Sequence, residues 1–289
     1  MRRPMVIAEI GCNHKGDLKI AKEMIKIAAL FSKVDAVKFQ KRNNKELLSE
    51  DEFNAPHPNP ANSYGATYGE HREFLEFTLE QHKELKELCE EYGLVYSTSV
   101  WDMTSAKEII TLKPQFIKIP SAMNTHFEML EYLFDNYDGE IQISTGMTKL
   151  EETEKIVNLA VKKNRNKDIV LYSCTSGYPV PYEDICLLEI NNLIDKYKDK
   201  VKAIGFSGHH LGTSVDIAAY TLGAEYIERH YTLDKTWKGT DHSASLEPEE
   251  MRKLVIDLDN ISKALTYKKE EILDIEKVQR KKLKYKNRV

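Results

Sequence analysis

The chain has 289 residues, of which 41% are hydrophobic and 30% are charged. This composition is typical of a globular protein and excludes a disordered chain or a small disulfide-rich scaffold. The 42 basic and 46 acidic residues give a net charge of -4, so no overall field draws the protein to nucleic acid or to a membrane surface.

Three features predict the cellular compartment. No apolar run reaches the roughly 18–20 residues of a membrane span, and the opening MRRPMVIAEIG lacks the long apolar core of a signal peptide. The cysteines show no Cys-x-x-Cys spacing, so we expect reduced thiols in a cytoplasmic protein with neither membrane nor nucleic-acid partners. The cysteines are Cys12, Cys89, Cys174 and Cys186.

Short β-rich runs alternate with longer amphipathic runs along the chain. The predicted strands are residues 5–11, 36–40, 94–99, 116–121, 140–146, 169–176, 203–209 and 226–232. Residues 18–31, 71–92 and 150–163 repeat apolar positions every three or four residues, as helices do, and a last helix begins at Pro248. Eight strand–helix units predict a closed (β/α)8 barrel. An open doubly wound sheet is less favoured, because no G-x-G-x-x-G follows the first strand.

One segment interrupts this alternation. Residues 41–67 contain three prolines, and we expect an irregular lid or substrate loop there. We place His57, His71 and His82 on loops or helix surfaces. The barrel is predicted to span residues 1–267, and no second domain is predicted.

Polar residues gather where the predicted strands end, which in a barrel of this kind is the face that carries chemistry. Lysines and hydroxyls there favour an anionic, phosphate-bearing substrate. Two histidines on adjacent strands, with glutamates nearby, suggest an open divalent-metal site. The residues at these ends are Glu9, Lys38, Gln40, Thr98, Lys118, Ser121, Ser144, Ser176, Tyr178, Ser207, His209, Glu228 and His230.

Each of these residues also has a purely structural interpretation. A lone histidine is more often a hydrogen-bonded structural residue, and serine or threonine at a strand end often only caps a helix. Lys38 and Lys118 argue against a purely structural interpretation, because each lies in an apolar strand rather than on a solvated surface. Burying two unpaired ammonium groups costs several kcal/mol, so we expect an anion to meet them.

Several motifs together resemble the sialic acid synthase family. They are AEIGCNHKGDLKIAKEMI, AVKFQK, TYGEHREFLEF, KIPSAMNTH, STGM, CTSGYPVP, GFSGHH and IERHYTLDKTWKGTDHSASLEPEE. The resemblance covers about residues 4–265 and implies a barrel that joins phosphoenolpyruvate to an N-acylhexosamine to make a nonulosonic acid. The run TLDKTWKGTDHSASLEP is most similar to the animal branch, whose substrate is a sugar 6-phosphate.

The resemblance also implies roles for individual residues. His209 and His230 would bind Mn²⁺ or Mg²⁺, and Lys38 and Lys118 would hold phosphoenolpyruvate. His210 departs from the family pattern and is either a bystander or a further polar group near the metal. The implied catalytic residues are Glu9, Glu228, Lys38 and Lys118. The implied substrate-binding residues are Gln40, Thr98, Ser121, Ser144, Ser176, Tyr178, Ser207 and Asp241.

The C-terminal end differs from that family, whose members usually continue into an antifreeze-like domain that reaches the partner subunit's active site. Residues 268–289 resemble only the linker to such a domain. The resemblance suggests a homodimer and, if the barrel stands alone, weak discrimination between N-acetylmannosamine and mannose. Seven basic residues and no acidic one lie in 277–289. We favour a solvated linker there over a docking site for an acidic partner.

Two other functions stay open at this stage. The same condensation on a non-aminated aldose would give a deoxyulosonate. A non-catalytic barrel that binds a sugar phosphate is the alternative from a different class, although the complete set of histidines, lysines and glutamates argues against it.

Overall fold

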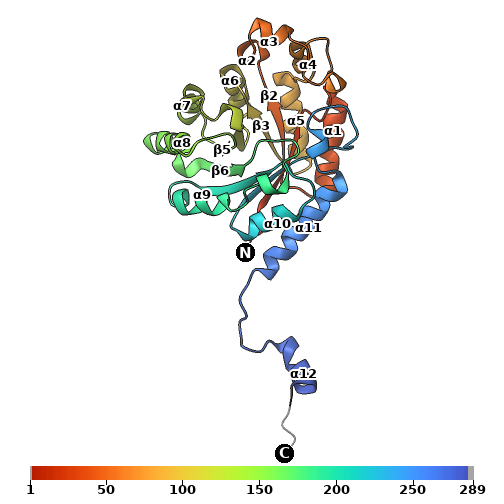
Figure 1. Cartoon of the computed structure of the whole chain (residues 1–289), viewed down its shortest axis with the longest axis vertical. Coiled ribbons are helices and arrows are strands. Elements are labelled where there is room, and N and C mark those ends of the chain that lie inside the picture. Colours follow the sequence, from red (N-terminus) through yellow and green to blue (C-terminus); the bar gives the residue numbers. More distant parts are fainter. Residues whose placement is uncertain (1, 286–289) are drawn as a thin grey trace, which may run out of the picture.

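The eight β-rich runs form eight parallel strands that close into one barrel in sequence order, which confirms the predicted (β/α)8 fold (Figure 1). The computed structural model describes residues 2–285. The strands are β1 Met5–Gly11, β2 Ala36–Lys41, β3 Val95–Val100, β4 Phe116–Ile119, β5 Glu140–Ser144, β6 Ile169–Cys174, β7 Ala203–Gly208 and β8 Tyr226–His230. Strand β4 ends before Pro120, which has no N–H to continue the ladder.

Helices follow every strand and surround the barrel. They are α1 Leu18–Ile27, α2 Asn44–Leu47, α3 Glu50–Asn54, α4 Tyr68–Phe74, α5 Leu79–Glu91, α6 Met103–Thr111, α7 Phe127–Asn136, α8 Leu150–Lys162, α9 Glu189–Tyr197, α10 Ser214–Thr221, α11 Pro248–Ala264 and α12 Asp274–Leu283. The single helix predicted over 71–92 is wrong. Thr78 and Gln81 form a capping box that begins α5, separately from α4.

Side-chain alternation along the strands separates two environments. Lys38 and Gln40 of β2 point into the barrel, whereas Phe39 between them packs outward in the main core. Apolar side chains fill the interior toward the N-terminal ends of the strands: Ile7, Ala36, Phe116, Val170, Tyr172 and Ala203. The barrel is therefore closed by an apolar layer below and has a polar mouth above.

Residues 41–67 are more ordered than expected. The segment contains α2, α3 and a 3-10 turn at Pro60–Asn62. A capping box between Ser49 and Glu52 begins α3, so polar residues that suggested a loop act here as helix caps.

Of the three histidines predicted on loops or helix surfaces, His57 does lie in a loop, but all three are buried, so the helix-surface positions of His71 and His82 are wrong. His57 and His71 are only 8% and 7% exposed, and their rings pack edge to face with centroids 4.4 Å apart. His82 is fully buried, and its Nδ1 lies 2.8 Å from the Tyr96 hydroxyl. Aromatic packing and hydrogen bonding offset the free-energy cost of burying these polar rings.

The C-terminal part of the described chain leaves the barrel. Helix α11 packs on it, and α12 then lies well away at the end of an extended segment (Figure 1). The predicted boundary at residue 267 falls between these two helices. Residues 286–289 of the predicted linker lie outside the described part of the chain. Within residues 2–285, no helix combines the length and apolar character that crossing a bilayer demands.

Candidate active site

The C-terminal ends of the strands surround a polar cavity of about 330 Å³. Of the predicted site residues, all but Thr98 and Asp241 line it. Those that line it are Glu9, Lys38, Gln40, Lys118, Ser121, Ser144, Ser176, Tyr178, Ser207, His209, Glu228 and His230. Closure of the barrel therefore places at one mouth residues that are up to 221 positions apart in the chain, from Glu9 to His230. This is the arrangement expected from the position of active sites at the C-terminal ends of barrel strands.

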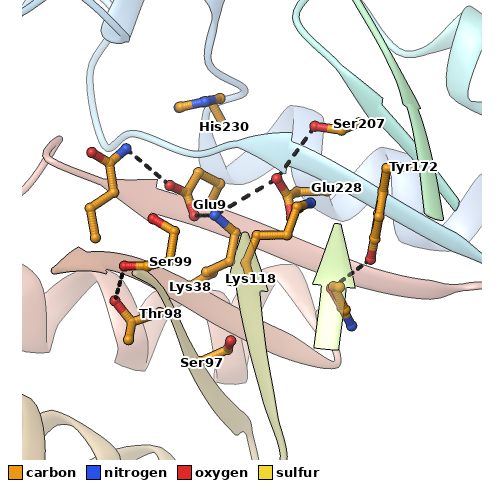
Figure 2. A network of polar contacts seen from close by, with 12 residues as sticks. Glu9, Lys38, Ser97, Thr98, Ser99, Lys118, Tyr172, Ser207, Glu228 and His230 are labelled. Atoms are coloured by element: carbon orange, nitrogen blue, oxygen red, sulfur yellow. Dashed lines mark hydrogen bonds and ion pairs between the residues drawn. The ribbon is translucent and has the colours of Figure 1, made fainter. Parts of the chain in front are cut away.

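Two lysines and two glutamates form a buried ion network in the floor of this cavity (Figure 2). Lys38 Nζ lies 2.5 Å from Glu9 Oε2 and 3.7 Å from Glu228 Oε1. Lys118 Nζ lies 2.8 Å from Glu228 Oε2. An anion does meet each lysine, as the cost of burying an unpaired ammonium group led us to expect, and in the structure it is a carboxylate from another strand.

The two glutamates have opposite pKa shifts. Burial opposes ionisation of Glu228, but Lys118 and Lys38 outweigh it and hold the pKa of this carboxyl at about 2. Burial raises the pKa of Glu9, and Lys38 offsets this only in part. Glu228 is therefore a permanent anion that holds both lysines, whereas Glu9 is the carboxyl suited to exchange a proton.

The lysines also differ. Burial lowers the pKa of Lys118 in spite of Glu228, whereas Glu228 and Glu9 together raise the pKa of Lys38 against the effect of burial. Lys118 Nζ lies 3.6 Å from the centre of the Tyr172 ring, which adds a cation–π contact beneath the ammonium group.

Hydroxyl and amide groups complete the cavity wall. Gln40 donates to Glu9 Oε1 at 3.3 Å, and Ser207 donates to Glu228 Oε1 at 3.3 Å. A Cβ on Gly146 would lie 2.5 Å from Ser176 Oγ and 2.7 Å from Ser121 Oγ. A side chain at position 146 would displace both hydroxyls, so the glycine lets Ser121 and Ser176 approach the same stretch of backbone.

The predicted histidine pair is present above this network. The rings of His209 and His230 have centroids 5.4 Å apart, and Tyr178 packs 4.5 Å from the His209 ring. His209 Nδ1 donates to the Thr175 carbonyl at 3.0 Å, which leaves Nε2 with its lone pair free. Burial lowers the pKa of His209 to about 3, so this imidazole is neutral.

These donors fit a divalent metal in an open site. The Nδ1 atom of His230 is buried without a hydrogen-bond partner, and it lies 3.7 Å from Asp241 Oδ2. Among residues 2–285, no group of three or more histidine, cysteine, aspartate or glutamate side chains is placed to hold a metal ion, so the pair would be the protein's only ligands of these types here. Two imidazole ligands would leave coordination positions for substrate oxygens, as catalytic sites require.

Thr98 is a correction to the predicted site. It pairs with Phe39 in the sheet and shares that residue's outward face, while Ser99 pairs with Gln40 and lines the mouth. Trp101 Nε1 donates to Ser99 Oγ at 3.0 Å. The alternation of side chains along β3 could have corrected this. Tyr96 faces outward, and because every second residue of a strand lies on the same face, Thr98 faces outward as well.

Other lining residues were missed, since they have no charge to single them out. They are Ser99, Pro120, Ala122, Met147 and Cys174. Cys174 Sγ lies 4.0 Å from His209 Nδ1, and burial raises the pKa of its thiol. His14 does not line the cavity, and its ring stacks on that of Phe77 with centroids 4.0 Å apart.

The fold and the mouth define a (β/α)8 barrel with a catalytic-type site, in which a buried lysine–glutamate network lies beneath a histidine pair. The chain belongs to the NeuB family, whose model matches residues 24–270. This agrees with the resemblance to sialic acid synthases seen in the sequence motifs.

Named relatives support this membership. The chain is 36% identical over 271 residues to the human N-acetylneuraminate-9-phosphate synthase, covering 94% of this chain and 74% of that protein. It is 35% identical over 266 residues to the N,N'-diacetyllegionaminic acid synthase of Campylobacter jejuni, covering 92% and 78%. The N-acetylneuraminic acid synthetase of Leptospira borgpetersenii, solved with citrate, superposes with a TM-score of 0.82 at 30% identity, covering 99% and 94%.

Proposed function

We propose that this protein condenses phosphoenolpyruvate with an N-acylmannosamine, or its 6-phosphate, to give a nonulosonic acid and free phosphate. The observation that carries the proposal is the buried network of Lys38, Lys118, Glu9 and Glu228 directly beneath His209 and His230. Relatives named as nonulosonic acid synthases support the same reaction.

The lysines act as a fixed electrostatic site for phosphoenolpyruvate. Glu228 holds both ammonium groups in the cavity before substrate arrives, so little reorganisation is needed when the phosphate and carboxylate bind. Hydroxyls at the same level supply further donors, and they belong to Ser121, Ser144, Ser176 and Ser207. The enol carbon is then directed toward the sugar aldehyde.

The bond changes follow from this placement. The enol carbon of phosphoenolpyruvate attacks the aldehyde carbon of the open-chain sugar, forming a C–C bond, and the aldehyde oxygen takes up a proton. Water adds to the cationic carbon that bears the phosphate and loses one proton, which gives a tetrahedral intermediate. The C–O bond to phosphate then breaks while the hydroxyl loses its proton to the leaving phosphate, which leaves a ketone. Glu9, with its raised pKa, carries the other protons.

His209 and His230 would hold the Mn²⁺ or Mg²⁺ of the proposed site. A metal bound there would supply Lewis-acid polarisation of the aldehyde oxygen. The protein's own part is to keep His209 neutral by burial and to fix its tautomer through the Thr175 carbonyl. Tyr178 and Asp241, at the rim beside the histidines, would contact sugar hydroxyls.

Phosphate release from phosphoenolpyruvate, measured with N-acetylmannosamine, its 6-phosphate and mannose, with and without Mn²⁺, tests the proposal. We expect metal-dependent release with an N-acyl sugar. If phosphate is released with mannose but with neither N-acyl sugar, the deoxyulosonate reaction is indicated. If a sugar phosphate binds and no phosphate is released from phosphoenolpyruvate, a non-catalytic barrel is indicated.

A covalent mechanism needs its own control, because burial lowers the pKa of Lys118 as it does for Schiff-base lysines. We expect borohydride to trap no adduct with pyruvate or phosphoenolpyruvate. A stable adduct on either lysine would replace the proposed mechanism with that of a pyruvate–lysine aldolase. The homodimer suggested by the sequence stays a prediction, and sedimentation of the full chain tests it.

A further inference from the structure

The outer faces of β7 and β8 carry a second polar cluster, directly behind the proposed site. Side chains alternate along β8, so Glu228 and His230 point into the mouth while Arg229 between them points outward. His210 follows His209 at the end of β7 and is 1% exposed. The residue that the sequence left without a role therefore lies behind the histidine pair.

Arg229 joins His210 to helix α10. Its Nη1 donates to Asp216 Oδ2 at 2.5 Å and to His210 Nε2 at 3.0 Å. The guanidinium also donates to two backbone carbonyls of the loop after β7, those of His210 and Gly212. An arginine cannot accept, so Nε2 of His210 is the acceptor in this contact, and the same atom lies 3.4 Å from Asp216 Oδ2.

The backbone around the cluster is shaped to hold it. A Cβ on Gly208 would lie 2.8 Å from His210 Cε1, so the His210 ring packs against a position that only glycine allows. Gly212 has a φ of +73°, which turns the loop back toward Arg229. Val180 N donates to the His209 carbonyl at 3.0 Å and holds the same loop from its other side.

Stability alone does not account for this cluster. Arg229 and Asp216 are fully buried, and three polar atoms, His210 Nδ1, Asp216 Oδ1 and Arg229 Nε, have no hydrogen-bond partner among the described residues. A buried network that is only partly satisfied stabilises a fold less than apolar residues of the same size would. Such a network is expected where a defined geometry matters more than stability.

We propose that Asp216, Arg229 and His210 form a positioning triad that sets the geometry of the histidine pair from outside the barrel. None of the three lines the mouth, so they act through their neighbours: His210 through His209, and Arg229 through Glu228 and His230. The functional consequence rests on the proposed function, in which His209 and His230 hold the metal.

The coupling is mechanical. Gly208 pairs with Arg229 across β7 and β8, and Glu9 of β1 pairs with His230. If the loop after β7 moves relative to β8, the two imidazoles change their separation while Glu228 stays with the lysines. The triad prevents this by tying the loop carbonyls, His210 and α10 to one guanidinium.

A matched pair of substitutions at His210 tests the triad in the full chain. His210→Leu has a similar volume but no acceptor for Arg229, whereas His210→Gln retains an acceptor at about the position of Nε2. Two readouts are measured beside thermal unfolding. They are the imidazole ¹H–¹⁵N resonances of His209 and His230 in the metal-free protein, and the affinity for Mn²⁺ by calorimetry.

We expect His210→Leu to shift or broaden both imidazole resonances, to weaken Mn²⁺ binding at least tenfold and to lower kcat more than it changes KM for phosphoenolpyruvate. For His210→Gln, the Mn²⁺ affinity, kcat and KM should each stay within threefold of the values of the unsubstituted protein. Unchanged resonances and Mn²⁺ affinity in a folded His210→Leu protein would overturn the triad, as would equal damage from both substitutions.

The triad and the proposed function can fail separately. Displaced resonances in His210→Leu, together with an unsubstituted protein that neither binds Mn²⁺ nor releases phosphate, would support the triad and overturn the proposed function. Normal turnover and metal binding in both variants, with unmoved resonances, would support the function and overturn the triad.

Discussion

Basic residues occupy two contrasting places in this protein, the barrel mouth and the C-terminal helix α12. Lys38 and Lys118 are buried and paired with Glu9 and Glu228. The basic residues of α12 are exposed and form only local pairs, such as Lys277 with Asp274 at 2.7 Å. The mouth has fewer positive charges than the tail, yet it is where a substrate anion would be held.

The difference teaches that burial, rather than the density of charge along the sequence, marks the functional lysines. Water screens the charges of α12, so each contributes little energy. In the mouth, the same charge lies in a medium of low polarity, where its interactions are strong and its partners must be in place. Pairs of identical substitutions in the two regions therefore sharpen the comparison.

The largest effect is expected from Glu228→Gln, with Glu276→Gln as its counterpart in α12. Removing Glu228 leaves two buried lysines without their shared partner, which should cost about 3–5 kcal/mol of the free energy of unfolding. Glu276 pairs with Lys268 on the surface, where water screens the pair, so its loss should lower the free energy of unfolding far less. Urea denaturation measures both, and equal losses would contradict the distinction between the regions.

The next effect concerns the histidine pair. His230→Ala should weaken Mn²⁺ binding about a hundredfold or more, roughly 2.7 kcal/mol, because a site with two protein ligands cannot retain its metal on one. His126→Ala is the control, since this histidine caps α7 outside the cavity. Calorimetric titration with Mn²⁺ compares them. Equal affinity in the two variants would show that His230 is structural.

A third comparison sets Lys118→Met against Lys281→Met. A charge-assisted contact is worth about 1.5–3 kcal/mol, so the first change should raise KM for phosphoenolpyruvate about 10- to 100-fold while changing KM for the sugar little. Lys281 is exposed on α12, and its replacement should leave both constants unchanged. Steady-state kinetics, with each substrate varied in turn, measures KM for phosphoenolpyruvate and for the sugar in both variants. A shift confined to the sugar would mean that the anion site is assigned wrongly.

The smallest expected effect on kcat at neutral pH comes from the ionisation of Glu9, which changes only at acidic pH. Burial raises the pKa of this carboxyl, so its ionised form is lost as the pH falls through a value above the usual 4.5. If ionised Glu9 accepts the proton of water, kcat declines over that acidic range and not at higher pH. Glu9→Gln should lower the plateau and abolish this acid limb. A limb that persists unchanged in kcat–pH profiles of the variant would assign it to another group.

The raised pKa of Glu9 also affects stability, with the sign set by linkage. The folded state binds this proton more tightly than the unfolded state does, so the contribution is fully present below the unfolded pKa and is lost as the pH rises through the folded value. Glu9 is therefore a functional group that the fold tolerates at neutral pH, whereas Glu228 is ionised throughout.

The sequence by itself determined the barrel and most of its mouth. Alternating β-rich and amphipathic runs predict eight strand–helix units, because the two periodicities differ and each unit needs a partner to cover its apolar face. Strand ends in such a barrel converge, so local patterns such as AVKFQ and FIKIP were enough to place Lys38 and Lys118 together.

Only the tertiary structure decided how these groups are paired and which way they face. The partners of Lys38 and Lys118 come from other strands, and no local pattern specifies a contact between residues 110 positions apart, as with Lys118 and Glu228. Thr98 was misplaced because a shift of one residue reverses the face of a strand. The capping boxes of α3 and α5 compete with loop preferences, and the outcome depends on the packing around them.

His210 and Arg229 show the same limit most clearly. In the sequence each is a neighbour of a predicted site residue, and nothing local tells whether it joins the mouth or lies behind it. Closure of the barrel gives every strand an inner and an outer face, and the outer face of β8 meets Asp216 of α10. That juxtaposition comes from long-range packing, which is why the triad could be found only in the folded chain.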